Sequence, residues 1–117
     1  MDQSVLLVIL ALVKGDISAS FANAPSIKAC QTKLEQIGPT LKRAGYKVIE
    51  SRCVVSPQKF TSYRTRRSKN APRVNYLITF PAHGVTITPM AGKMACEQAR
   101  AKAGQTGYCT TSRQKLR

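Results

Sequence analysis

Residues 56–73 read SPQKFTSYRTRRSKNAPR, and this stretch divides the chain into two halves of similar organisation. It contains no acidic residue and no apolar period, and Pro57 and Pro72 stand near its two ends. Such a segment is typical of a loop or arm between packed units. We therefore expect a first unit over residues 1–55, a basic linker or arm over 56–73, and a smaller second unit with a basic tail over 74–117, all within one compact domain.

The arm combines positive charge with aromatic rings. Basic side chains bind nucleic acid by displacing counterions from phosphates, and aromatic rings can stack on bases. The candidate residues for binding nucleic acid or another polyanion are Lys59, Arg64, Arg66, Arg67, Lys69 and Arg73, with Phe60 and Tyr63 as stacking residues. Lys42-Arg43 and the tail residues Arg113, Lys115 and Arg117 extend the same predicted positive face. A solvated linker that only keeps the protein soluble is the alternative explanation.

The composition is that of a small globular protein with an extreme charge. The chain has 117 residues, which suits one domain, and 43% of them are apolar, which argues against wholesale disorder. Its formal net charge is +14, from 19 Lys and Arg against 5 Asp and Glu. A field of this sign attracts nucleic acid, an acidic protein surface or an anionic membrane.

An even number of cysteines permits a disulfide framework, with three alternative pairings. The four are Cys30, Cys53, Cys96 and Cys109, and they include no Cys-x-x-Cys pair, which argues against a structural zinc site. The organisation of the chain favours bonding of Cys30 to Cys53 and of Cys96 to Cys109. Four buried free thiols in a reducing compartment are the alternative.

The apolar run from Val5 to Val13 has two competing interpretations. As the hydrophobic region of a signal peptide it would precede the small-residue sequence Ala22-Asn23-Ala24. Against this, Asp2 and no basic residue comes before the run, and Lys14 comes directly after it. The run is also too short to cross a bilayer as a helix. Export therefore stays open, with an intracellular or virion-associated location slightly favoured.

A β-hairpin is the interpretation that we favour for this region. The Val5–Val13 run is rich in Val, Ile and Leu, as in a strand buried on both faces. Lys14-Gly15 suits a two-residue turn, and Ile17, Ala19 and Phe21 then alternate with polar residues.

A helix and a strand are expected to complete the first half. Ser26 is a favourable N-cap, and one apolar face follows at Ile27, Cys30, Leu34, Ile37 and Leu41. We expect Gly38-Pro39 to kink or break this helix, because proline lacks the N–H and clashes with the preceding turn. Residues 46–55 then read as a strand that contains Cys53.

The second half repeats this order. Val74, Tyr76, Ile78 and Phe80 alternate as a strand, which favours core packing over base stacking for Tyr76. A short strand, a helix capped by Thr88 with Pro89 at its first position, and a last strand around Cys109 follow. The sequence thus predicts an α+β fold of two layers. We expect a tandem ββαβ duplication, a mainly antiparallel sheet and two helices on one face.

The first half also carries a resemblance. Its features are the apolar strand from Val5 to Val13, then Phe21, a helix that contains Cys30, and a final strand ending in Cys53-Val54. In these it resembles small accessory proteins of bacteria and their phages. The resemblance implies an accessory role and brings no catalytic residue with it.

The residues argue against catalysis. His83 is the single histidine, lies in an expected turn and has no carboxylate beside it in the sequence. The acids are scattered, and neither a phosphate-binding lysine loop nor a dinucleotide fingerprint is present. We expect no enzyme activity, no cofactor and no metal site.

Three functions are therefore considered, in this order. The first is electrostatic binding of nucleic acid or an acidic protein surface. The second is a structural part of a phage virion or similar assembly, in which the exposed hairpin edge pairs with a neighbour or a second copy. The third is an exported, disulfide-stapled protein acting on anionic surfaces. No amphipathic basic helix supports insertion into a membrane.

Overall fold

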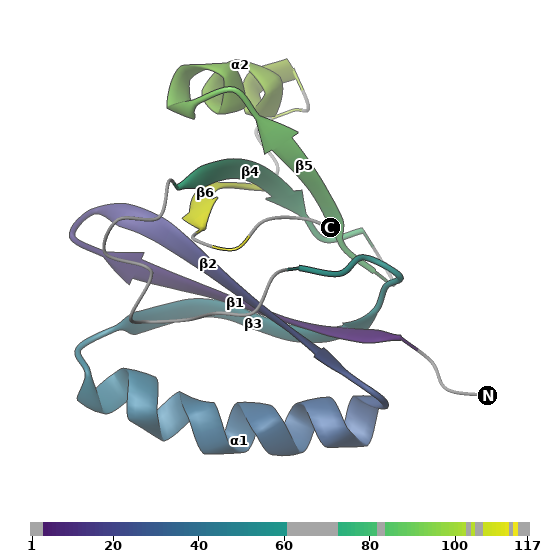
Figure 1. The fold of residues 1–117 in the computed structure, drawn as a ribbon. Coiled ribbons are helices and arrows are strands. Elements are labelled where there is room, and N and C mark those ends of the chain that lie inside the picture. Colours follow the sequence, from purple (N-terminus) through teal and green to yellow (C-terminus); the bar gives the residue numbers. More distant parts are fainter. Residues whose placement is uncertain are drawn as a thin grey trace.

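The computed structural model describes residues 4–60, 73–81, 84–102, 104, 107–112 and 114. Within them, two helices and six strands follow the order ββαβ twice (Figure 1). The first four elements are β1 (Val5–Val13), β2 (Asp16–Ala24), α1 (Ile27–Arg43) and β3 (Lys47–Val55). The other four are β4 (Val74–Thr79), β5 (Thr86–Met90), α2 (Lys93–Lys102) and β6 (Tyr108–Ser112). The predicted α+β class is confirmed.

The strands form one mixed sheet in the order β3-β1-β2-β6-β4-β5. Every neighbouring pair is antiparallel except β2 and β6, which meet in parallel at Ser18 and Thr111. In each half the last strand pairs with the first, and the first pairs with the second. A tandem duplication would produce this repeated order, and the common origin of the two halves stays a prediction.

The expected hairpin forms β1 and β2. Lys14 has φ 51° and Gly15 has φ 85°. Both turn residues therefore have the positive φ that a two-residue type I′ hairpin turn requires. β1 lies between β2 and β3, and each of its residues from Val5 to Leu10 is at most 4% exposed. The run is therefore a strand buried on both faces, as predicted.

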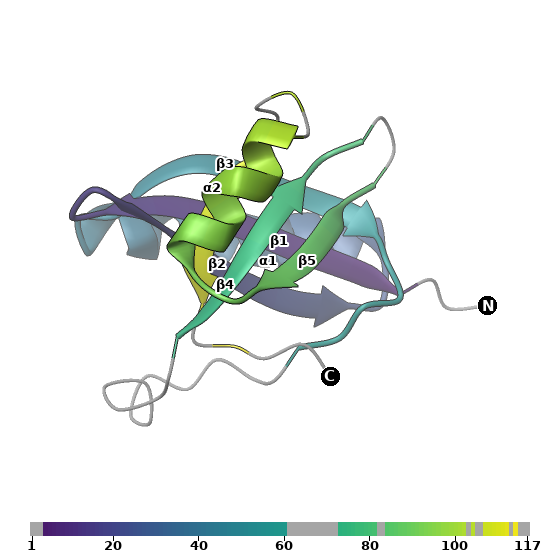
Figure 2. The same ribbon diagram turned by 90° about the horizontal axis from the view of Figure 1, so that it is seen from above.

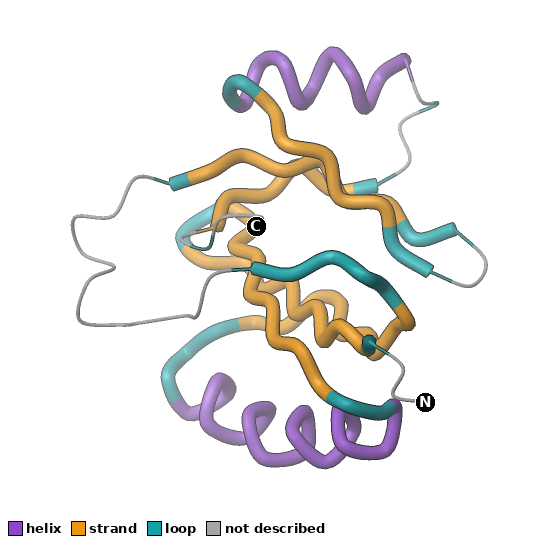
Figure 3. Tube along the Cα trace, turned by 45° about the vertical axis from the view of Figure 1, so that its right-hand side comes forward, coloured by secondary structure: helices purple, strands orange, loops and turns teal. Residues whose placement is uncertain are grey.

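Two apolar cores lie on opposite faces of β1. The inner core joins Leu6, Val8 and Leu10 of β1 to Tyr76 and Ile78 of β4. The outer core places the alternate residues of β1 beneath α1. Figures 1 and 3 show the result as four layers: α1, the first three strands, the second three strands, and α2.

Both helices cover the outer face of the sheet, as expected, but they end up on opposite sides of the molecule. The sheet folds over between β2 and β6, where Ser18 and Thr111 make their only described residue pair. This weak join lets the two halves close on the inner core, and the expected two layers become four.

Side chains from both halves reinforce this closure at one end. The guanidinium of Arg52 on β3 lies 4.5 Å from the ring centroid of Phe80, next to β4. Arg52 Nε also donates to Glu50 Oε1 at 2.9 Å, and the Tyr108 hydroxyl of β6 donates to Glu50 Oε2 at 3.3 Å. These contacts tie β3 to strands that are not its neighbours in the sheet.

The helix α1 begins where the sequence indicates. The Ser26 side chain accepts a hydrogen bond from the N–H of Ala29 at 3.1 Å, and the predicted apolar face packs on the outer core. The expected break does not occur, since α1 continues through Pro39 to Arg43, and the alternative of a kink stays a prediction. Pro39 has no N–H to donate to the carbonyl of Glu35, one turn earlier. Both residues are exposed, so water can hydrogen-bond to that carbonyl instead.

The start of α2 differs from the prediction. Thr88 and Pro89 belong to β5, and the helix begins at Lys93, with the Cys96 N–H bonded to the Gly92 carbonyl at 3.0 Å. Proline is tolerated here because β5 is the last strand of the sheet, where an edge N–H needs no partner.

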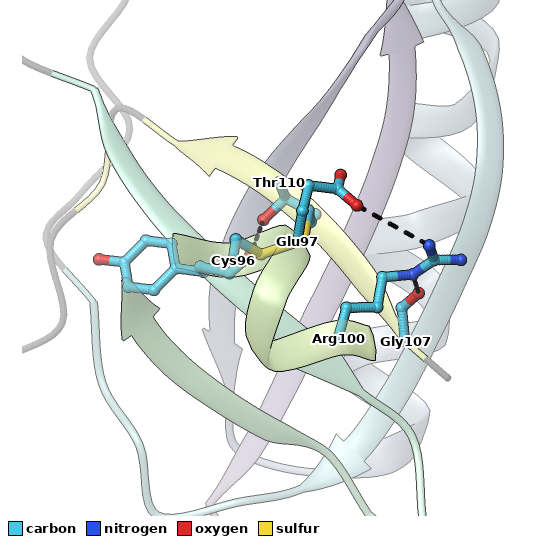
Figure 4. The surroundings of a disulfide bond; sticks show 7 residues. Cys96, Glu97, Arg100, Gly107 and Thr110 are labelled. Atoms are coloured by element: carbon cyan, nitrogen blue, oxygen red, sulfur yellow. Dashed lines mark hydrogen bonds and ion pairs between the residues drawn. A yellow bond between two sulfur atoms is a disulfide. The ribbon is translucent and has the colours of Figure 1, made fainter. Parts of the chain in front are cut away.

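Both predicted disulfides are present, and each joins a helix to the last strand of its half. Cys30 bonds to Cys53 and Cys96 to Cys109, with Cα atoms 6.0 and 5.8 Å apart. Figure 4 shows the surroundings of the second bond, where Arg100 Nε donates to the Gly107 carbonyl at 3.0 Å.

Candidate polyanion interface

The segment that leads into the arm is held by an aromatic cluster of Phe21, Phe60 and Tyr76. The rings of Phe21 and Phe60 are stacked, with centroids 3.9 Å apart and planes at 8°. Tyr76 meets both rings edge-on, with centroids at 5.9 Å. The phenyl ring of Phe60 is only 7% exposed, so it is a core residue and is not available to stack on a base. The preference for core packing of Tyr76 is confirmed, because that residue is 1% exposed.

Gln114 brings the C-terminal region to the same cluster. Its side-chain Oε1 accepts from the Phe21 N–H at 2.8 Å, and its Nε2 donates to the Phe21 carbonyl at 2.7 Å. The Tyr76 hydroxyl donates to the Gln114 carbonyl at 3.0 Å. The side-chain amide presents an N–H donor next to a carbonyl acceptor, as a peptide group does. Gln114 therefore bonds to the Phe21 backbone in the way that a neighbouring strand would. Sequence reasoning missed this residue, since no pattern distinguishes it from an exposed glutamine.

Two of the predicted basic residues lie within the described part of the chain, at the ends of the arm. Lys59 is exposed and directly precedes the buried Phe60. Arg73 is exposed and directly precedes β4, and its Nη1 donates to Thr111 Oγ1 at 3.2 Å. Neither Lys59 nor Arg73 forms an ion pair with any acid that the structure describes. The other predicted residues of the arm, Tyr63, Arg64, Arg66, Arg67 and Lys69, lie outside the described residues.

The first residues of the arm are fixed by polar contacts as well. Asn23 Nδ2 on β2 donates to the Gln58 carbonyl at 3.2 Å, and the Gln58 N–H donates to Ser56 Oγ at 3.2 Å. Ser56 itself is buried, and its N–H bonds to the Ser4 carbonyl at 2.9 Å. The chain therefore enters the arm from a well-anchored position beside β2.

Three described acids form ion pairs with basic residues outside the arm. Asp16 lies 3.5 Å from Lys93 Nζ, Glu50 binds Arg52, and Glu97 Oε2 lies 4.0 Å from Arg100 Nη1. These pairs are local and mostly exposed, so each contributes little to stability. They leave the charge of Lys59 and Arg73 uncompensated.

Lys42 and Arg43 occupy the last turn of α1, where positive charge complements the helix dipole. This helix packs on the outer core, whereas Phe60 lies in the inner core on the other face of β1. A layer of sheet therefore lies between this basic pair and the aromatic cluster. In Figure 2, which looks down from the side of α2, the helix α1 lies behind the strands. The tail residues Arg113, Lys115 and Arg117 lie outside the described residues, although the first two adjoin Gln114 in the sequence.

Within the described residues, no group of three or more His, Cys, Asp or Glu side chains is placed to hold a metal ion. No helix in that part of the chain is long and apolar enough to cross a bilayer. His83 is not among the described residues. No protein-family model, curated protein or solved structure matches the chain.

Proposed function

We propose that this protein binds nucleic acid electrostatically, through the arm at residues 56–73 and the basic C-terminal tail. The observation that carries the proposal is the aromatic cluster, which anchors both basic segments. Phe60 holds the start of the arm, and Gln114, inside the tail, is bonded to Phe21 in the same cluster. Two basic segments that are far apart in the sequence thus join the folded domain at one place.

Charge supports the same proposal. The net charge is +14, the arm itself contains no acid, and Lys59 and Arg73 form no ion pair with a described acid. Each cation that contacts a phosphate releases counterions, so affinity comes from many weak contacts and falls steeply with salt. With Phe60 buried, Tyr63 remains as the arm's candidate stacking residue, and we expect weak sequence preference.

Two charge-matched variants test the role of the arm. The arm variant replaces Arg64, Arg66, Arg67 and Lys69 with glutamine. The control variant makes the same glutamine replacement at four exposed residues outside the arm: Lys14, Lys28, Arg43 and Lys102. Fluorescence anisotropy with labelled duplex DNA and single-stranded RNA should show a loss of affinity of about tenfold or more for the arm variant. An equal loss in both variants would mean that only net charge matters and would contradict a localised site.

Polyglutamate of matched length distinguishes the kind of polyanion. If the proposal holds, nucleic acid binds more tightly than polyglutamate at equal salt, because phosphate density and base stacking both add to affinity. Tighter binding of polyglutamate would favour an acidic protein surface as the partner.

A second candidate function, a part of a virion or similar assembly, is favoured by the open edge at β3. The hairpin edge expected for this role is not open, because β1 and β2 each have a neighbouring strand on both sides. Strand β3 pairs with β1 alone among the described residues, and it exposes 39% of Val48, 36% of Ile49 and 50% of Val55. Unpaired edges with exposed apolar residues can add a strand from a neighbour. Light scattering over a concentration series should then detect oligomers that Val55→Lys abolishes. A protein that stays monomeric at high concentration would exclude self-assembly through this edge.

A further inference from the structure

An apolar hollow lies beneath the second half of α1, and the polyanion site makes no use of it. Its volume is about 320 Å³, within the range of small-molecule pockets. Leu7 and Ile9 of β1 and Ser18 and Ser20 of β2 form one wall, and Ile37 and Leu41 of α1 form the opposite wall. Open hollows of this size with a mainly apolar lining are the usual form of small-molecule sites.

The local sequence explains why the hollow exists. α1 is fixed at its first half by the bond from Cys30 to Cys53, and Cys30 is the only residue of this helix that is fully buried. Under the second half, the outer face of β2 offers Ser18, Ser20 and Ala22, whose side chains are short. Ile37 and Leu41 therefore face a gap and remain partly exposed.

Two lysines lie in a depression beside the hollow. A second depression adjoins the first and shares Ile9, Leu41 and Tyr46 with it, and its lining includes Lys42 and Lys47. Both lysines are exposed, and neither forms an ion pair with a described acid. Glu35 also lines this depression, so the formal net charge of these three residues is +1 rather than +2. The combination is an apolar hollow next to a depression that is lined by two lysines and one glutamate.

We propose that this hollow binds a single-chain carboxylate amphiphile, such as a medium-chain fatty acid. The hydrocarbon tail lies between α1 and the β1–β2 hairpin, and the carboxylate lies at Lys42 and Lys47. The volume of about 320 Å³ lies at the lower end of the range for small-molecule pockets, which suits a medium-length hydrocarbon chain. The hollow lies mainly on the other face of β1 from the aromatic cluster, and Phe21 is the one member of that cluster that also lines it.

A chain-length series tests the apolar part of the proposal. Hexanoate, octanoate, decanoate and dodecanoate are titrated below their micelle concentrations and followed by the amide shifts of Leu41 and Tyr46. Affinity should rise about fourfold with each added methylene until the hollow is full and then level off. An affinity that does not depend on chain length would mean that a basic protein attracts carboxylates non-specifically. That result would contradict binding of the hydrocarbon chain in the hollow.

Three variants test the location. Ser20→Leu fills the hollow and should abolish decanoate binding, while its unfolding midpoint reports that it still folds. The double variant K42Q/K47Q should weaken decanoate about tenfold and leave the neutral analogue decanol unaffected. The matched double variant K28Q/K102Q should change the affinity for neither decanoate nor decanol. A folded Ser20→Leu protein that binds decanoate as wild type does, or an equal loss in the two lysine pairs, would refute the proposal.

Discussion

Gly107 stands where the backbone of the turn before β6 passes very close to β4. Its φ is 93°, and a Cβ built there would lie 2.7 Å from the carbonyl oxygen of Ile78 and 2.6 Å from Thr79 Cγ2. Two separate penalties therefore oppose any side chain at this position: the positive φ and the contact with backbone. Arg100 depends on the same turn, because its Nε bonds to the Gly107 carbonyl.

Replacing Gly107 with alanine should lower the free energy of unfolding by about 3 kcal/mol, the sum of a positive-φ penalty and an overpacking penalty. Gly45→Ala is the matched control, since Gly45 has φ 86° and no atom within 4 Å of a built Cβ. That variant should lose only about 1 kcal/mol. Urea titrations of both proteins measure the difference. Equal losses would mean that β4 can move away from the turn at no cost.

The side chain of Gln114 replaces a missing strand partner for Phe21. Gln114→Ala would leave a buried N–H and a buried carbonyl without their bonds, which should cost about 3 kcal/mol. Gln98→Ala, at an exposed position on α2, should change stability by less than about 0.5 kcal/mol. Thermal unfolding of the two variants provides the comparison. A Gln114→Ala protein as stable as the control would show that water substitutes for the amide.

Single residues also show where sequence reasoning stops. Tyr76 was assigned to the core because it alternates with Val74 and Ile78, and the structure confirms it. Phe60 has no such neighbours, since it stands beside the arm, and only the fold reveals its stacking on Phe21. Gln114 gives no signal at all, because a buried polar side chain is recognised only by its partners.

At the scale of elements, local rules predicted most of the fold. The Ser26 cap, the apolar face of α1 and the turn at Lys14-Gly15 depend on neighbours within a few positions, so the sequence contains them in full. The continuation of α1 through Pro39 and the inclusion of Pro89 in β5 could not be predicted. Both depend on solvent exposure or an edge position, which tertiary structure decides.

Each disulfide should stabilise its own half. The two bonds close loops with sequence separations of 23 and 13 residues, and loop-closure entropy gives about 3 kcal/mol for each. The paired serine variants C30S/C53S and C96S/C109S should both lose about this amount in guanidinium unfolding. Reductant should destabilise the wild-type protein. It should leave the stability of the variant with all four cysteines replaced by serine unchanged. A wild-type protein insensitive to reductant would contradict this contribution.

At the scale of the whole molecule, the closure of the two halves could not be predicted. The expectation of two layers treated the sheet as open, whereas a strand order with a single described residue pair between β2 and β6 allows it to fold over. Only this folding brings Phe60 and Gln114, which are far apart in the sequence, to the same cluster.

The salt dependence of DNA binding tests the central claim most directly. The logarithm of the association constant for duplex DNA is measured against the logarithm of salt concentration, for the wild type and for the arm and control variants. We expect a wild-type slope of about −4 or steeper, a slope smaller by about 3 in the arm variant, and little change in the control. A slope near zero in the wild type, or equal slopes in the two variants, would contradict binding through the arm.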